Sequence, residues 1–302
     1  MGIIRADLHM RGPIGFQPYW LKKQRYAGKN LLKLISDEAF RKRITITAIT
    51  SQADEIFPGS VHDRFYCLKE CEARTIPENY RVDSIGRNIL VVEKGGEIVY
   101  IVNGQTVMPK ENGNRYDLLV IGSNQVPNDL LFRDTLNYCS NNGLISIAEH
   151  PLMESHRGMG QALLERHIEK FDAIEGHNSQ VIFENWATKI PSIGGMLSKA
   201  GRELNLRAKI FATENEKPYI ATSDAHRIED LGISYIEWID NLKNTSEEKF
   251  IQDLRARIKS NDFGNMERYE STLSWFKWVL TFQRGIRPGK VQDIYIPSEG
   301  LS

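Results

Sequence analysis

Residues 221–226 read Ala-Thr-Ser-Asp-Ala-His, and this short stretch decides how the rest of the chain is interpreted. An apolar run from Pro218 to Ala221 ends directly in Asp224 and His226, two side chains of the metal-binding type. On a strand, positions i and i+2 share a face, so both side chains can point at one spot. A loop Asp that caps a helix, followed by an exposed His, is the alternative that this stretch alone leaves open.

Polar residues of the same kind follow other apolar runs. They are Asp7 and His9, Glu97 after a glycine turn, Glu149 and His150, and Glu175 and Asn178. In α/β sheets and barrels, ligands bind beyond the carboxyl ends of the strands. Imidazoles combined with carboxylates suit zinc, manganese or iron, so the pattern predicts one convergent metal site.

Helical and strand-like segments alternate along most of the chain. The spacing predicts helices over residues 30–43, 128–142, 160–171, 202–215 and 246–261, and strands over 2–9, 44–50, 116–122, 144–150, 172–176 and 218–224. Residues 88–109 predict two strands joined at Gly95-Gly96, followed by a second turn at Asn103-Gly104. Repeated β-then-α units favour a parallel sheet or a closed barrel over an all-β fold.

The composition is that of an ordinary globular protein, with 302 residues, 41% hydrophobic and 26% charged. The 39 basic and 39 acidic side chains balance, so the charge does not indicate a nucleic-acid or anionic-membrane partner. Three cysteines are too few for a disulfide framework and favour a reducing compartment. No stretch of about 20 apolar residues is present, so we expect no membrane span and a cytoplasmic protein.

One large domain is the simplest division of this length. We expect it to cover residues 1–265, with a helix and tail over 266–302 packed on it. The predicted C-terminal helix carries an aromatic stripe, Trp275, Phe276, Trp278 and Phe282, which is typical of core packing or of a partner surface. If the stripe is exposed, it predicts a homo-oligomer interface.

Six stretches, ADLHM, ITITAIT, GGEI, AEHP, IEGHN and TSDAH, resemble in order and spacing the motifs of the PHP (polymerase and histidinol phosphatase) family. The resemblance extends over about residues 4–262. It implies a distorted seven-stranded β/α barrel with a helical C-terminal extension and with metal ions at the carboxyl-end mouth. It also implies a metal-dependent phosphoesterase that acts on a phosphorylated small molecule or nucleotide.

Carried over residue by residue, the resemblance implies five metal ligands: His9, Glu97, His150, Asp224 and His226. Two positions depart from the family pattern, because Arg11 and Gln52 stand where the family has His. Arginine cannot ligate a metal and carries a fixed positive charge, and glutamine is a weak ligand. The sequence therefore predicts one or two divalent ions (zinc, manganese or iron), and it leaves open that the metal has been lost.

Other residues of the site have two interpretations each. Arg11 either holds phosphate oxygens or forms a salt bridge with Glu97 or Asp224 in an inactive site. His226 is a ligand or a general acid. Three further residues are candidates for substrate binding, although a solvated loop or a backbone-bonded amide explains them as well: His156, Arg157 and Asn178.

These observations favour a metal-dependent phosphoric ester hydrolase with a reduced metal site. The alternative is a catalytically inactive PHP-like module with a binding, regulatory or assembly role, which the replacements at Arg11 and Gln52 favour. A nuclease is a third interpretation, and it requires a basic groove that composition does not reveal.

Overall fold

The structure is a computed structural model that describes residues 2–11, 29–52, 64–181, 194–242 and 246–271, without the side chains of 52, 64 and 194–200. Seven strands form a nearly closed barrel in the order β1-β2-β5-β8-β9-β10-β11. Their bounds are Gly2–Met10 for β1, Ile46–Gln52 for β2, Glu97–Val107 for β5, Leu118–Ile121 for β8, Ile145–Ala148 for β9, Ala173–Asn178 for β10 and Tyr219–Thr222 for β11. This confirms the expected distorted seven-stranded barrel.

A short seam joins the first and last strands of the barrel. Met10 pairs with Ala225 just after β11, and the amide of Ala225 donates to the carbonyl of His9 at 3.0 Å. The first part of β1, Gly2 to Ala6, pairs with the antiparallel strand β12 (Tyr235–Asp240). The strand β12 also pairs with β13 (Gly264–Met266). The pairing of β1 with β2 shifts register between Asp7 and Met10, so the end of β1 departs from regular alternation.

Strand direction decides which residues meet at the mouth. The strands β1, β2 and β5 are parallel to one another, as are β9, β10 and β11. The strand β8 runs against both of its neighbours, β5 and β9. The carboxyl ends of six strands therefore share one end of the barrel with the amino end of β8, which the expectation of repeated parallel units did not include.

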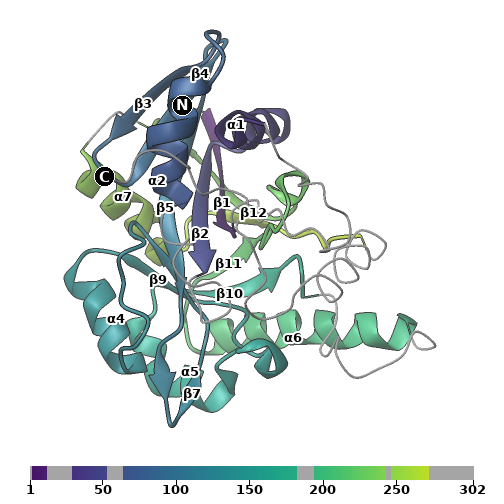
Figure 1. Cartoon of the computed structure of the whole chain (residues 1–302). Coiled ribbons are helices and arrows are strands. Elements are labelled where there is room, and N and C mark those ends of the chain that lie inside the picture. Colours follow the sequence, from purple (N-terminus) through teal and green to yellow (C-terminus); the bar gives the residue numbers. More distant parts are fainter. Residues whose placement is uncertain (1, 12–28, 53–63, 182–193, 243–245, 272–302) are drawn as a thin grey trace, which may run out of the picture.

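Helices cover the outside of the barrel in two groups (Figure 1). The first group, α1 (Leu31–Lys42) with α2 (Arg64–Cys67), the π-turn Leu68–Glu72 and α3 (Ala73–Thr75), packs against β2 and β5. The second group, α4 (Phe132–Asn141), α5 (Gly160–His167) and α6 (Gly194–Glu214), covers β8, β9 and β10. The remaining helix, α7 (Glu247–Ser260), packs into the apolar cluster of the barrel strands through Phe250, Ile251, Leu254 and Ile258.

Local sequence signals explain where these elements begin. Asn30 accepts from the amide of Lys33 at 2.7 Å and caps α1, and Ser246 accepts from the amide of Lys249 and caps α7. The predicted turn at Lys94-Gly95-Gly96 joins β4 (Ile89–Lys94) to β5. Residues 81–85 form an additional strand, β3 (Arg81–Ile85), which the sequence analysis did not identify.

The second turn predicted at Asn103-Gly104 is wrong, because β5 continues through both residues to Val107. Gly104 serves close approach of the backbones instead. A Cβ atom added at Gly104 would lie 2.7 Å from the carbonyl oxygen of Val120 on the neighbouring strand. Glycine is therefore needed there for packing and not for a turn.

The end of the chain was predicted to form a separate helical extension. The predicted boundary at residue 265 falls inside β13, and the aromatic stripe from Trp275 to Phe282 lies outside the described residues. The division therefore stays a prediction. A small hairpin of β6 (Lys110–Glu111) and β7 (Asn114–Arg115), with short 3₁₀ turns at Glu154–His156, Ile168–Lys170 and Ile228–Asp230, completes the described elements.

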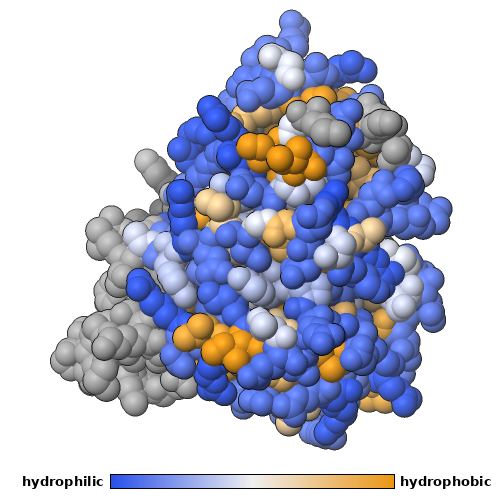
Figure 2. Space-filling model, turned by 180° about the vertical axis from the view of Figure 1, so that it is seen from behind, coloured by the Kyte–Doolittle hydropathy of each residue, from blue (hydrophilic) through white to orange (hydrophobic). Residues whose placement is uncertain are grey.

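The face of the molecule in Figure 2 is mainly hydrophilic and carries separate small apolar patches. Ile3 and Ile239 are exposed cross-strand partners of β1 and β12. Among the described helices, none is long and apolar enough to cross a membrane.

Candidate metal centre at the barrel mouth

Strand ends bring a set of polar side chains into one buried cluster at the mouth. Its members are His9 and Arg11 from the end of β1, Thr106 from β5, Asp117 before β8, Glu149 and His150 after β9, Glu175 and Asn178 from β10, and Asp224 after β11. All nine are buried. We call this set the mouth cluster. Charged groups are rarely buried unless they are paired, so the mouth cluster marks a functional region.

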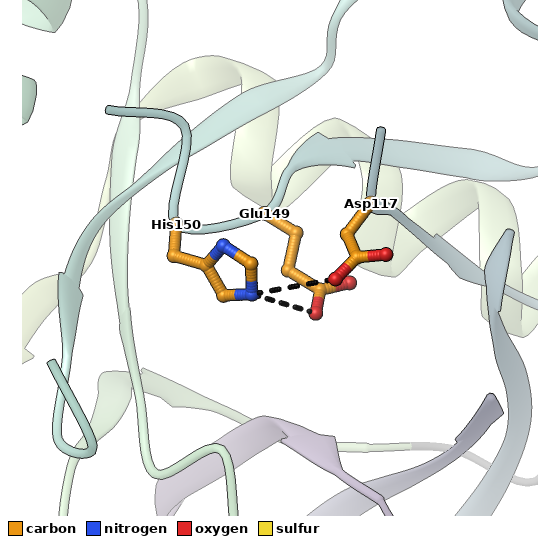
Figure 3. Close-up of side chains that lie close together, drawn as sticks. All are labelled: Asp117, Glu149 and His150. Carbon is orange, nitrogen blue, oxygen red and sulfur yellow. Dashed lines mark ion pairs between the residues drawn. The ribbon is translucent and has the colours of Figure 1, made fainter. Parts of the chain in front are cut away.

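Asp117, Glu149 and His150 form a compact triad, in which the three ligand atoms lie within 4.8 Å of one another. The Nε2 atom of His150 is 3.2 Å from Glu149 Oε1 and 3.7 Å from Asp117 Oδ2, as Figure 3 shows. Among the described residues, neither ring nitrogen of His150 has a hydrogen-bond partner, and Asp117 Oδ1 also lacks one there. Buried polar atoms are nearly always hydrogen-bonded, so an imidazole left this way is suited to bind a ligand.

His9 lies beside the triad and is held by three carboxylates. Its Nδ1 atom is 2.7 Å from Glu175 Oε1, while Nε2 is 3.2 Å from Asp224 Oδ1 and 3.5 Å from Glu149 Oε1. Glu175 therefore orients the imidazole by accepting from Nδ1, which turns Nε2 toward the other acids. The second oxygen of Glu175 accepts from the amide of His150 at 2.6 Å and fixes the end of β9 as well.

Arg11 links two acids of the mouth cluster, the one that follows β9 and the one that follows β11. Its Nη2 atom donates to Glu149 Oε1 at 2.5 Å, and its Nε atom donates to Asp224 Oδ1 at 3.2 Å. Nη2 is also 3.9 Å from Asp117 Oδ2. Of the two interpretations from sequence, the structure shows the salt bridge with Asp224, and it adds Glu149 as the second partner.

Carboxylates outnumber fixed positive charges in the mouth cluster, which contains four acids, Asp117, Glu149, Glu175 and Asp224, and one guanidinium, that of Arg11. Burial alone would lower the pKa of His9, but the charges of Asp224, Glu149 and Glu175 raise it to about 10. Burial raises the pKa of Asp117, and the charge of Glu149 raises it further. The mouth cluster therefore attracts positive charge, which either protons or a metal ion can supply.

The remaining predicted residues lie around this centre. Asn178 Nδ2 donates to Glu175 Oε2 at 3.0 Å and to Asp224 Oδ2 at 3.2 Å, so it holds carboxylates in place. His226 Nδ1 lies 2.8 Å from the carbonyl oxygen of Asp224, and burial lowers the pKa of His226 to about 4. His156 is exposed, with its ring 5.6 Å from that of His150, and Arg157 Nη1 is 3.9 Å from Asp117 Oδ1.

Glu97 is not part of the mouth cluster, so its assignment as a ligand is corrected. It is exposed at the first position of β5, opposite Lys94 in the β4–β5 hairpin, at the far end of the strand from the mouth. The residue that reaches the mouth cluster from β5 is Thr106, whose hydroxyl donates to Glu149 Oε2 at 2.9 Å. The GGEI stretch is thus a hairpin turn. Gln52 ends β2 at the register of Thr106, and its side chain lies outside the described part.

Three acids of the mouth cluster were not among the individual site residues predicted from the sequence. Glu149 and Glu175 were included in the convergent site expected at the strand ends, but neither was assigned as a ligand, although each lies within the AEHP or IEGHN stretch. Asp117 was not noted, because it precedes its strand instead of following it. The reversed direction of β8 brings Asp117 to the mouth, and one strand read alone does not reveal its direction.

The donor set fits a divalent cation. Two imidazoles and several carboxylates, with buried ring nitrogens that lack partners, match the ligand preference of zinc, manganese or iron. Among the predicted ligands, His9, His150 and Asp224 are brought together, and His226 lies next to them. Arg11 opposes a cation, because its positive charge lies against the same oxygens.

Three solved structures resemble this fold. PsfC from Pseudomonas syringae matches over 94% of this chain and 98% of its own, with TM-score 0.55 and 14% identity. A two-domain protein from Bacteroides vulgatus, which contains a predicted PHP-like metal-dependent phosphoesterase, matches over 88% of this chain and 65% of its own, with TM-score 0.51 and 13% identity. The lesion-specific endonuclease EndoQ from Pyrococcus furiosus matches over 88% and 58%, with TM-score 0.46 and 12% identity.

These likenesses concern the fold, and this chain spans less than two thirds of the length of the last two proteins. No curated protein sequence matches it. Residues 202–257 match the family model PHP_C, described as PHP-associated. This segment extends from α6 through β11 and β12 into α7, and it includes Asp224 and His226. Residues 202–257 are thus similar to a PHP-associated family model, and the fold as a whole is similar to that of PsfC and of the Bacteroides vulgatus protein.

Proposed function

We propose that this chain is a metal-dependent phosphoesterase of the PHP type with a reduced metal centre, in which Asp117, Glu149 and His150 hold one divalent ion. The observation that carries the proposal is the buried Nε2 atom of His150, which faces two carboxylates and has no hydrogen-bond partner in the part of the chain that the structure describes. His9 and Asp224 stand close enough to complete the site or to bind a second ion. This ligand set replaces the one predicted from sequence, in which Glu97 took part.

A bound divalent ion supplies an activated water and polarises a phosphoryl oxygen. The residues of the chain would do the rest. Arg11 is the guanidinium nearest to the triad and suits phosphate oxygens. His226 is neutral near pH 7, because burial lowers its pKa to about 4, so it is suited to act as a neutral ligand beside Asp224.

The substrate that we propose is a phosphorylated small molecule or nucleotide. His156 and Arg157 lie at the edge of the triad, where they would contact the group that leaves. Asn178 is fully bonded to two carboxylates, and we assign it to positioning them instead of to substrate contact. The free cysteines suit a reducing compartment, and we propose a cytoplasmic protein.

The test is metal content together with turnover. Purified protein is analysed for bound metal and assayed on a chromogenic phosphate ester with Mn²⁺, Zn²⁺ and Fe²⁺. We expect about one ion per chain. His150→Ala should lose both metal and turnover, whereas His167→Asn, a change at a buried histidine of α5 outside the mouth cluster, should keep both. A wild-type protein without metal or turnover would contradict the proposal.

A second candidate is a catalytically inactive module that binds or regulates. The observation that favours it is the pairing of Arg11 with both Glu149 and Asp224, because this arrangement neutralises acids that a metal would otherwise bind. The variant Arg11→His distinguishes the two candidate functions. In an inactive module, this change removes the competing charge, adds an imidazole and creates metal binding that the wild-type protein lacks.

A further inference from the structure

One oxygen atom of the mouth cluster lies against a guanidinium and two imidazoles. Glu149 Oε1 accepts from Arg11 Nη2 at 2.5 Å and lies 3.2 Å from His150 Nε2 and 3.5 Å from His9 Nε2. Asp117 Oδ2 repeats the pattern at longer range, 3.9 Å from Arg11 Nη2 and 3.7 Å from His150 Nε2. The guanidinium of Arg11 therefore lies beside the same two oxygens, Glu149 Oε1 and Asp117 Oδ2, that face the Nε2 atom of His150.

A cation on Glu149 Oε1 would lie beside a charge that cannot be removed, because arginine stays protonated in proteins. Arg11 is buried, so water screens this repulsion poorly. The carboxylate can therefore satisfy the guanidinium or the metal, and each weakens the binding of the other.

The side chain of Arg11 can leave without stripping its partners. Glu149 would keep its bond from Thr106 at 2.9 Å, and Asp224 would keep its bond from Asn178 at 3.2 Å. The backbone of Arg11 is tied to the seam by its amide, which donates to the carbonyl of Ala225 at 3.0 Å. Only the side chain has to move, and a phosphate-like anion is the group that would draw it away.

We propose that Arg11 is an internal competitor of the divalent cation, and that an anion which pairs with its guanidinium raises the affinity of the site for metal. This inference rests on the proposed function, because it takes the triad as the metal site. Coupling of this kind is reciprocal, so metal must also strengthen binding of the anion. The site would then load metal and phosphate together.

The first experiment is a calorimetric titration of the wild-type protein with Mn²⁺, in chloride and in inorganic phosphate at equal ionic strength. We expect phosphate to tighten Mn²⁺ binding about 10-fold, within the usual range of coupling between sites. Sulfate should act in the same direction. His150→Ala titrated in the same buffers corrects for complexes that Mn²⁺ and phosphate form in solution.

The second experiment removes the competitor. Arg11→Met should bind Mn²⁺ in chloride as tightly as the wild-type protein does in phosphate, and phosphate should add nothing. Arg255→Met is the matched control, because Arg255 Nε also donates to a buried carboxylate, Asp172 Oδ1 at 2.9 Å, but this pair lies outside the mouth cluster. The control should keep the phosphate effect.

The outcomes separate this inference from the proposed function. Tight Mn²⁺ binding that depends on His150 but not on phosphate or Arg11 would overturn the competition and leave the metal site intact. Folded wild-type and Arg11→Met proteins that both fail to bind Mn²⁺ would overturn the proposed function as well. If Arg11→Met does not fold, the phosphate titration of the wild-type protein decides alone.

Discussion

Two buried carboxylates, Asp7 and Asp117, show how differently the seam and the mouth of the barrel are built. At the seam, Asp7 is fully buried and accepts from the amide of Gly232 at 2.7 Å, from the amide of Ser223 at 3.1 Å and from the Ser223 hydroxyl. At the mouth, Asp117 is equally buried, but its Oδ1 atom has no hydrogen-bond partner within the described segments.

This difference separates a structural acid from a candidate ligand. Amide and hydroxyl donors around Asp7 offset part of the loss of water, although burial still raises the pKa of this carboxyl, and the carboxylate ties β1 to the segment after β11. In the described part of the chain, Asp117 Oδ1 has no such donor and keeps its burial cost, which for an unsatisfied polar group is about 1–3 kcal/mol. A fold retains such a cost where a ligand can later relieve it.

The largest expected effect is on the seam. Asp7→Ala should lower the free energy of unfolding by about 3 kcal/mol or more, because the donors of Ser223 and Gly232 lose their acceptor inside the protein. Urea denaturation followed by circular dichroism measures it. A loss below about 1 kcal/mol would show that the seam does not depend on this carboxylate.

Asp117→Asn should have the opposite signature. Burial raises the pKa of Asp117, so its charge is unfavourable in the folded state, and the amide should leave the metal-free protein at least as stable as the wild type. Affinity for Mn²⁺ should fall about 10-fold or more, because a ligand is lost. A strong loss of stability with unchanged Mn²⁺ affinity would make Asp117 another structural acid.

Asp230 represents an intermediate case, since it shares the guanidinium of Arg227 with Glu270. Burial, together with Glu270, raises the pKa of Asp230 to about 7 from an ordinary value of 3.8. The folded protein therefore holds a proton that the unfolded chain releases, and stability should fall as pH rises from about 4 to about 7. Asp230→Asn should flatten this dependence of stability on pH. A wild-type stability profile that is already flat over this range would contradict the raised pKa of Asp230.

The smallest effect is expected at Glu97. Because this residue is exposed in the β4–β5 hairpin, Glu97→Gln should change stability by less than about 0.5 kcal/mol and leave Mn²⁺ binding unchanged. The same two measurements serve as a baseline for the Asp7 and Asp117 variants. A loss of metal in this variant would restore the ligand set predicted from sequence.

The sequence was informative where a signal is local. Apolar periodicity predicted α1, α7 and most barrel strands, and the motif order predicted the barrel itself. His9, His150 and Asp224 were found because each directly ends an apolar run. Glu97 was a false match, since a glycine turn before an acid also describes an ordinary hairpin.

The kind of elements and their order follow from the sequence alone, because helix and strand periodicities and capping residues act over a few neighbours along the chain. Which of the described acids lack donors depends on the tertiary structure. The reversal of β8 brings Asp117 to the mouth, and the packing of strand ends sets Arg11 between Glu149 and Asp224. Hydrogen-bond satisfaction and charge pairing depend on distances across the barrel, and these distances exist only once the strands have assembled.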